Sequence, residues 1–220
     1  MKTYDKMVDL FEKSNERFLE RDRSLFISQV SERTLCGALM LHIDRILHDD
    51  RNLVGYYVDV EYNRNAGAIK TICKTIKGPD MKVIRINCDL IVHSRGEIAK
   101  QDNLIAIEMK KSTASKTCKD NDKERLIALT KDTFDDIWSF DGKSLPEHVC
   151  RYLLGVYYEI DFGRKLIYVE YYRKGSRVKK YTVNITSVFN SIRRNSGHRV
   201  VGHRPVGWRS ERYGIIRPWT

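Results

Sequence analysis

Apolar residues recur along the chain in two patterns, one typical of helices and one typical of strands. Spacings of three and four residues predict helices over residues 2–20 and from about Ser28 or Ser31 to Leu47, and a further helix that is capped by Asp120 or Asp122 and ends near Lys131. Strand-length runs of branched apolar residues predict strands over residues 54–64, 87–93, 104–110, 151–160 and 165–172. A strand over 181–185 and a helix over 187–193 are less distinct. Residues 68–81 are weakly patterned, residues 134–146 are irregular, and residues 197–220 form an extended arm.

The strands over residues 87–93 and 104–110 are separated by a polar loop with turn-forming residues. Folded as a hairpin about the loop 94–103, the simplest symmetric register sets Asp89 opposite Glu108. Side chains alternate along a strand, so one face is wholly apolar and comprises Ile86, Cys88, Leu90, Val92, Ile105, Ile107 and Met109. The other face comprises Asn87, Asp89, Ile91, His93, Leu104, Ala106, Glu108 and Lys110. A slip of one residue would bury charges in the apolar layer, which favours this register.

The order of the predicted elements indicates the fold class. Hairpin strands before a crossover helix predict an α/β fold, in which a mixed β-sheet is flanked by helices. A length of 220 residues suits one medium domain. We divide the chain into an N-terminal helical appendage (1–27), a core (28–163), and a basic C-terminal strand and arm (164–220).

Three charged residues converge at one end of the predicted hairpin. Asp89 and Glu108 lie on neighbouring strands, and Lys110 points to the same side as Glu108. Hard divalent cations such as Mg²⁺ or Mn²⁺ prefer oxygen ligands, typically one or two carboxylates completed by water and phosphate. Such a cation lowers the pKa of a water molecule and offsets charge on a phosphate under attack, and a lysine beside it can orient that water. Alternatively, Asp89 is a charge at a strand edge, and Glu108 and Lys110 are a solvated pair.

Glu32 is a further candidate, because it lies at the start of the second predicted helix. It precedes Leu35, Cys36 and Leu39 by three, four and seven residues, so it points along the buried face of that helix. A carboxylate in that position is costly without a partner or a metal. The alternative is that Glu32 lies in the first turn because its charge favours the helix dipole.

The positive charge of the chain is concentrated at its C-terminal end. The net charge is +11, and residues 164–220 hold 14 Lys and Arg against Glu170 and Glu211, a net charge of +12. A basic segment interleaved with aromatic residues is typical of proteins that bind a phosphate backbone. The residues concerned are Arg173, Lys174, Arg177, Lys179, Lys180, Arg204, Arg209, Arg212 and Arg217, with Trp208, Tyr213 and Trp219 among them. A basic surface can also serve solubility alone.

The cysteines and the hydropathy of the chain bear on its surroundings. The five cysteines are far apart and have no paired spacing, which leaves no recognisable zinc site and favours a reducing compartment. No apolar run approaches the roughly 18 residues that a membrane span needs, and the N-terminus lacks the apolar region of a signal peptide. We therefore expect a cytoplasmic protein without a membrane partner.

Five segments of the chain resemble, in order and spacing, small uncharacterised bacterial members of the PD-(D/E)XK nuclease superfamily, also called restriction-endonuclease-like. They are Ser31-Glu-Arg, Val58-Asp-Val-Glu-Tyr-Asn-Arg64, Asp89-Leu-Ile-Val-His-Ser-Arg-Gly96, Asn103-Leu-Ile-Ala-Ile-Glu-Met-Lys-Lys-Ser112 and Asp122-Lys-Glu-Arg-Leu126. The resemblance covers about residues 28–162. It implies a core of a helix, three strands, a helix and a strand.

The resemblance also assigns roles to individual residues. It implies that Asp89 and Glu108 bind the metal, that Lys110 serves the attacking water, and that Glu32 supplies an acid from a helix. Glu61 matches a further acidic position, which makes it a candidate metal ligand. Cys88 stands where the name of the superfamily puts proline, at a position that tolerates substitution.

Together these features predict a metal-dependent nuclease that hydrolyses phosphodiester bonds of nucleic acid, with DNA favoured. The alternatives are a nucleic-acid-binding module that kept the fold and lost turnover, and an interaction protein whose basic tail binds an acidic partner. A homodimer is compatible with the sequence, because nucleases that cut both strands often act as pairs.

Overall fold

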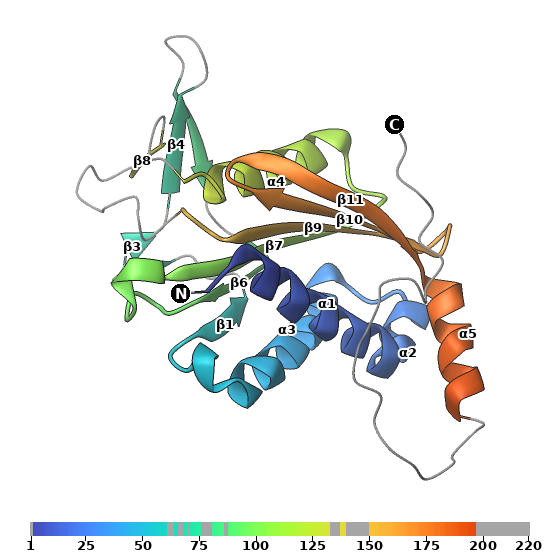
Figure 1. The fold of residues 1–220 in the computed structure, drawn as a ribbon. Helices are drawn as coiled ribbons and strands as arrows, with labels where there is room; N and C mark the ends of the chain where they lie inside the picture. Colours follow the sequence, from blue (N-terminus) through green and yellow to red (C-terminus); the bar gives the residue numbers. More distant parts are fainter. Residues whose placement is uncertain are drawn as a thin grey trace.

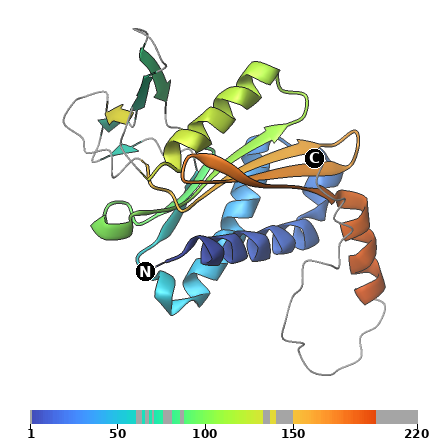
Figure 2. The same cartoon turned by 45° about the horizontal axis from the view of Figure 1, so that its top comes forward.

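The computed structural model describes residues 2–60, 64–65, 68–69, 71–75, 81–85, 88–132, 137–139 and 150–196. A six-stranded sheet with the strand order β1-β6-β7-β9-β10-β11 forms its centre (Figures 1 and 2). The strands are β1 (Tyr57–Val60), β6 (Leu90–His93), β7 (Asn103–Lys111), β9 (Leu154–Asp161), β10 (Leu166–Arg173) and β11 (Ser176–Asn184). Neighbouring strands are antiparallel except β7 and β9, which are parallel. The sheet is therefore mixed, as the sequence predicts.

Helices cover both faces of this sheet, as the two ribbon views show. Helices α1 (Tyr4–Arg21), α2 (Arg23–Ile27), α3 (Glu32–Asp49) and α5 (Ile185–Ser196) belong to one side, and α4 (Lys116–Leu129) lies on the other. Short 3₁₀ turns span Arg51–Leu53 and Ala99–Gln101. Helix α4 lies in the connection from β7 to β9, and parallel neighbours such as these require a crossover connection. No helix among the described residues is long and apolar enough to cross a membrane.

Each face of the sheet has its own hydrophobic cluster. On the α1–α3 face, Leu90, Ile107 and Val156 of the sheet pack in one cluster with residues of the helices such as Phe11 and Leu39. On the α4 face, the smaller cluster comprises Cys88, Ile91, Ala106, Leu126, Ala128, Leu129, Cys150, Tyr152, Tyr157 and Tyr172. The sheet is thus buried on both sides, and α4 is the only described helix packed on the second face.

The predicted hairpin register is confirmed where the structure pairs the two strands. Leu90 lies opposite Ile107 and Val92 opposite Ile105. This is the alignment that sets Asp89, one residue before β6, against Glu108. The loop between β6 and β7 runs from residue 94 to 102.

Two assignments to the faces of the hairpin are wrong. Cys88 belongs to the cluster on the α4 face, because it lies two residues before β6 begins and the alternation of the strand does not extend to it. Leu104 packs on the α1–α3 face beside Ile105, because the register shifts at this point and leaves Leu104 as the extra residue of a bulge. Ile86 and Asn87 lie outside the described residues.

The first and second predicted helices are confirmed as α1 and α3, and each has a side-chain cap. Thr3 caps α1 by accepting from Lys6 N, and Ser31 caps α3 by accepting from Thr34 N at 3.2 Å. The third helix exists, but its predicted start is wrong. Helix α4 begins at Lys116 because Ser115 caps it, with Oγ accepting from Cys118 N at 3.2 Å.

Several strands were missed by the sequence pattern. The weakly patterned residues 68–81 contain β3 (Ala68–Ile69), β4 (Thr71–Thr75) and the first residue of β5 (Met81–Arg85). β2 (Arg64–Asn65) pairs with β3. Residues 134–146 contain β8 (Ile137–Ser139), which joins β4 and β5 in a separate sheet. In its described part the predicted strand over 54–64 is the shorter β1, and residues 61–63 are outside the described residues.

The last described strands and the last described helix complete the same sheet and core. β9 and β10 match the predicted pair, and the less distinct predictions over 181–185 and 187–193 correspond to the end of β11 and to α5. Helix α1 and strands β9, β10 and β11 meet through Tyr158 and Tyr171, whose hydroxyls donate to Asn15 and Glu12. The predicted extended arm 197–220 lies outside the described residues.

Helix α1 should therefore be required for the stability of the whole fold. Phe11 is 0% exposed and its ring meets those of Tyr158 and Tyr171 edge-on. Phe11→Ala is expected to lower the free energy of unfolding by about 3–5 kcal/mol in urea, because it removes a buried ring and leaves a cavity. Lys13→Ala, on the exposed side of α1, is the control and should change it by about 0.5 kcal/mol or less. Equal effects of the two changes would mean that α1 is not part of the cooperative core.

Candidate active site

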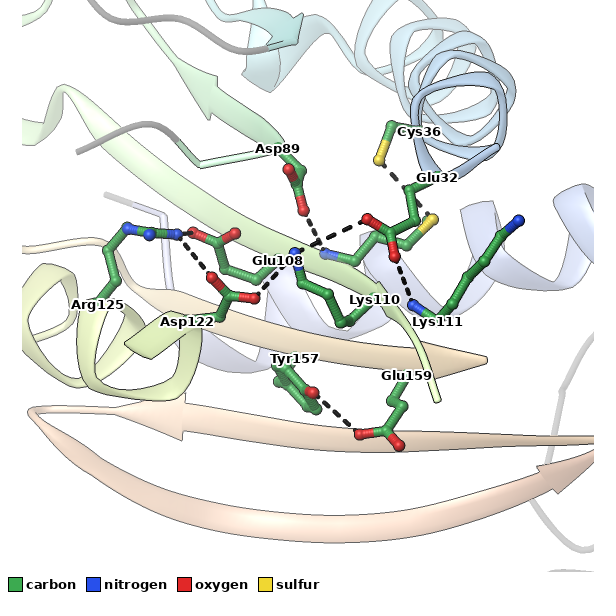
Figure 3. Close-up of polar contacts among 11 residues, drawn as sticks. Glu32, Cys36, Asp89, Glu108, Lys110, Lys111, Asp122, Arg125, Tyr157 and Glu159 are labelled. Atoms are coloured by element: carbon green, nitrogen blue, oxygen red, sulfur yellow. Dashed lines mark hydrogen bonds and ion pairs between the residues drawn. The ribbon is translucent and has the colours of Figure 1, made fainter. Parts of the chain in front are cut away.

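The structure brings together the four residues that the sequence singles out. Asp89 immediately precedes β6, Glu108 and Lys110 lie on β7, and Glu32 is the first residue of α3. Figure 3 shows these side chains in one cluster, between α3 on one side and α4 on the other. They are separated by up to 78 positions in the chain, so the tertiary fold, and not a local motif, creates the cluster.

Asp89 is held in place by the backbone of the neighbouring strand. Its Oδ2 accepts a hydrogen bond from Met109 N at 2.7 Å. Burial raises the pKa of the Asp89 carboxyl, more than the hydrogen bond from Met109 and the charge of Lys110 lower it. Asp122 and Glu32 raise this pKa further. The Asp89 carboxylate therefore belongs to a group of acids that repel one another.

Glu108 is buried, with 1% exposure, and it pairs with an arginine. Arg125 of α4 donates from Nη1 to Glu108 Oε1. Burial raises the pKa of the Glu108 carboxyl to about 8, although Arg125 beside it acts in the opposite direction. Asp89 and Asp122 raise the pKa further. A buried carboxylate of this kind needs positive charge around it.

Lys110 lies between two acids. Its Nζ is 3.1 Å from Asp122 Oδ2 and 3.8 Å from Glu32 Oε2. Burial lowers the pKa of Lys110, but Asp122, Asp89 and Glu32 outweigh burial, and the net pKa is raised. Lys110 therefore carries a positive charge at neutral pH, and it can donate hydrogen bonds but does not accept a proton.

Glu32 reaches the site because of how α3 begins. Ser31 caps the helix, so Glu32 occupies the first turn, where its charge is favoured by the helix dipole. Its Oε1 also accepts from Lys111 N at 2.7 Å, which ties α3 to the end of β7. Glu32 can therefore favour the dipole of α3 and also lie in the charged cluster, as predicted.

Asp122 and Arg125 of α4 are functional candidates that the sequence reasoning missed. Asp122 contacts Arg125 Nη1 through Oδ1 at 3.2 Å and Lys110 Nζ through Oδ2 at 3.1 Å. The signal was present in the helix period, because Asp122, Arg125, Leu126 and Leu129 follow one another at helical spacing on one face. Two charged residues on an otherwise apolar stripe indicate buried polar contacts.

The composition of the cluster suits one divalent cation. The carboxylates of Glu32, Asp89, Glu108 and Asp122 outnumber the cations Lys110 and Arg125 by two, which leaves a formal charge of −2. No group of three or more His, Cys, Asp or Glu side chains among the described residues is arranged to hold a metal ion. Magnesium is usually bound by one or two carboxylates with water and phosphate, and Asp89 and Glu108 supply that number. The donor set therefore fits such an ion.

Two cysteines near the site are not suited to nucleophilic catalysis. Cys36 of α3 contacts Met109 Sδ at 3.7 Å, and Cys88 is buried beside Glu108. Burial raises the pKa of both thiols, and the nearby carboxylates raise it further. A thiol with a raised pKa stays protonated and is a weak nucleophile.

The basic residues of the C-terminal region do not share one surface in the described part of the chain. Lys179 faces the α1 side, where its Nζ is 3.8 Å from Glu12, and Arg173 stacks over Tyr4. Arg177 faces the α4 side, 3.5 Å from Glu170. Lys174 pairs with Asp132, and Lys180 is exposed.

The remaining predicted site residues cannot be compared with the structure. Glu61 and the arginines Arg204, Arg209, Arg212 and Arg217 lie outside the described residues.

Comparisons with known proteins add no family to this description. No protein-family model matches the sequence, and neither the curated proteins nor the solved structures give a significant match. The candidate site therefore depends on the geometry of the chain's own residues.

Proposed function

We propose that this protein is a metal-dependent nuclease with a restriction-endonuclease-like core, which hydrolyses phosphodiester bonds of nucleic acid, DNA in preference. The observation that carries the proposal is the cluster of Glu32, Asp89, Glu108 and Lys110, in which a half-buried ammonium lies among three carboxylates and the formal charge is −2. An excess of acid at one end of a buried hairpin is costly for a fold and is explained by a cation that binds there.

Each residue has a role in this proposal. Asp89 and Glu108 would hold one Mg²⁺ or Mn²⁺, which when bound lowers the pKa of a water molecule and offsets charge on the phosphate. Lys110 stays protonated, so it would orient the attacking water or donate to the phosphate. Glu32 and Asp122 hold the ammonium in place from both sides.

A polyanion needs positive charge elsewhere on the protein, because the site itself is acidic. Arg177 and Lys180 of β11 lie on the face of the sheet that carries α4, the same face to which Glu108 and Lys110 point. Both are exposed at the edge of the sheet, where they can reach phosphate groups. In the same proposal, the basic residues beyond 196 make additional contacts with the phosphate backbone of the nucleic acid.

A second candidate function is a nucleic-acid-binding or interaction protein without turnover. The observation in its favour is the Arg125–Glu108 ion pair, because the guanidinium already neutralises a carboxylate that the nuclease needs for its metal. In this case the cluster is a structural charge network, and nucleic acid binds through the basic residues alone.

Incubation of the purified chain with labelled nucleic acid tests the proposal. Single-stranded DNA, duplex DNA and RNA are each supplied with Mg²⁺, Mn²⁺ or excess EDTA. We expect cleavage with either cation and none in EDTA. Undiminished cleavage in EDTA would refute the metal-dependent mechanism. Binding without cleavage of any substrate would support a nucleic-acid-binding protein instead, and the absence of both cleavage and binding would refute the nuclease and the nucleic-acid-binding protein alike.

A further inference from the structure

Within the described part of the chain, no backbone hydrogen bond to the Glu108 carboxylate is seen, whereas the carboxylates of Asp89 and Glu32 each accept one. Asp89 accepts from Met109 N and Glu32 accepts from Lys111 N, each at 2.7 Å. Glu108 instead meets the Nη1 atom of Arg125, a side chain from the opposite layer of the structure. Figure 3 shows one Glu108 oxygen directed at Arg125 and the other directed away from it.

Arg125 is itself held by Asp122, one turn earlier on α4. Asp122 Oδ1 is 3.2 Å from Arg125 Nη1, and Asp122 Oδ2 is 3.1 Å from Lys110 Nζ. Arg125 and Asp122, two neighbouring residues on one helix, therefore link Glu108 to Lys110. Both side chains of the pair are largely buried, with side-chain exposures of 17% for Arg125 and 8% for Asp122.

Helix α4 is a firm support for this pair because it packs closely on the sheet. Leu126 and Leu129 are 0% exposed beneath it. Gly155 of β9 allows the close approach, since a Cβ there would be 2.9 Å from Thr130 Cγ2 and 3.5 Å from Leu126 Cβ. A helix fixed in this way can orient a side chain in the site.

We propose that Arg125, held by Asp122, is a positioning residue that orients the Glu108 carboxylate, so that its second oxygen and Asp89 can bind one divalent cation. The inference rests on the proposed function, because it assigns Glu108 to a metal. Carboxylates that bind metals are commonly oriented by hydrogen bonds from outside the metal's own ligands, and loss of such a partner typically weakens metal binding by about 10–100-fold. The opposite role, in which Arg125 competes with the cation for Glu108, predicts tighter binding when the guanidinium is removed.

Titration with Mn²⁺ alone, in the absence of nucleic acid, separates these roles. Free Mn²⁺ is followed by electron paramagnetic resonance in the wild type and in Arg125→Met, Arg125→Lys and Lys123→Met. We expect Arg125→Met to weaken Mn²⁺ binding by about 10–100-fold. Arg125→Lys should recover most of the affinity, because one nitrogen, Nη1, makes both carboxylate contacts and an ammonium can replace it.

Lys123→Met is the matched control for the loss of a cation from α4. Lys123 pairs with buried Glu170 at 3.0 Å on the same face of the sheet, and Glu170 is not among the proposed ligands. The Lys123→Met change should leave Mn²⁺ affinity unchanged, even if it alters thermal stability. If Arg125→Met does not fold, as judged by circular dichroism, Arg125→Gln takes its place with the same expectation.

The possible results distinguish this inference from the proposed function. Weaker binding in Arg125→Met with recovery in Arg125→Lys supports a positioning role. Unchanged or tighter binding in Arg125→Met overturns the inference and leaves the nuclease proposal standing. A wild type that does not bind Mn²⁺ at all overturns the proposed metal site, and the inference with it.

Discussion

Asp89→Asn is expected to reduce divalent-dependent cleavage by about 10³-fold or more, while the protein remains folded. The amide oxygen of asparagine can still accept the hydrogen bond from Met109 N, so the local structure should persist. The change removes only the negative charge that the proposed cation requires. A bound metal supplies several kcal/mol of stabilisation to the transition state, and each 1.36 kcal/mol corresponds to a factor of ten in rate. Glu108→Gln should have the same effect, because it also removes a negative charge. Its amide oxygen can still face Arg125, so the local structure should again persist.

The control for this prediction is Glu170→Gln. Glu170 is a buried carboxylate like Glu108, and it is paired with Lys123 and Tyr172 on a strand farther along the sheet. Single-turnover cleavage with excess protein, together with circular dichroism, compares the three variants. If Glu170→Gln lost as much activity as Asp89→Asn, the losses would reflect the charge network in general. The assignment of Asp89 as a ligand would then be wrong.

The hairpin that carries the site could be predicted because its information is local. Apolar residues alternate along both strands, the loop contains turn-forming residues, and a slip of one residue would bury charges in the apolar layer. The structure pairs Leu90 with Ile107 in that register. The two errors, Cys88 and Leu104, lie where regular alternation ends, one before the strand and the other at a bulge. A sequence pattern holds only as far as the strand stays regular.

Asp122 and Arg125 were missed because the predicted start of α4 was wrong. Placing the cap at Asp120 or Asp122 made Asp122 a capping residue and hid its place on the buried face. The cap is Ser115, so Asp122 lies in the middle of the helix and reaches Lys110. Asp and Ser are both common N-caps. Which of them caps α4 depends on the helix face that packs on the sheet. That information comes from tertiary structure.

The second sheet was missed for a different reason. β4 pairs with β5 and with β8, and Ile72 lies opposite Ser139, which is 67 residues later in the chain. Strands of three to five residues have a weak local pattern, and their pairing depends on residues distant in sequence. β4 and β8 each lack a strong local signal, although they pair in one sheet.

Lys110→Met should separate catalysis from binding more clearly than any other change in the site. The ammonium is held at 3.1 Å from Asp122 and 3.8 Å from Glu32, with a side-chain exposure of 17%. Its pKa is raised, because the charges of Asp122, Asp89 and Glu32 outweigh burial, so at neutral pH it is a donor and not a base. Methionine keeps the apolar stem and removes the charge, which limits the change in packing.

We expect Lys110→Met to lower the single-turnover rate on bound substrate by about 10²–10³-fold, as loss of one transition-state donor does, and to change substrate affinity little. Affinity is measured separately by fluorescence anisotropy in Ca²⁺, and the rate in Mg²⁺ with the protein in excess. Lys123→Met, which removes a similarly half-buried ammonium paired with Glu170, serves as the control and should leave the rate unchanged. Loss of affinity with an unchanged rate on bound substrate would reduce Lys110 to a phosphate anchor. An unchanged rate and an unchanged affinity would show that Lys110 has no role in cleavage, because loss of an ammonium that contacts the attacking water should lower the rate.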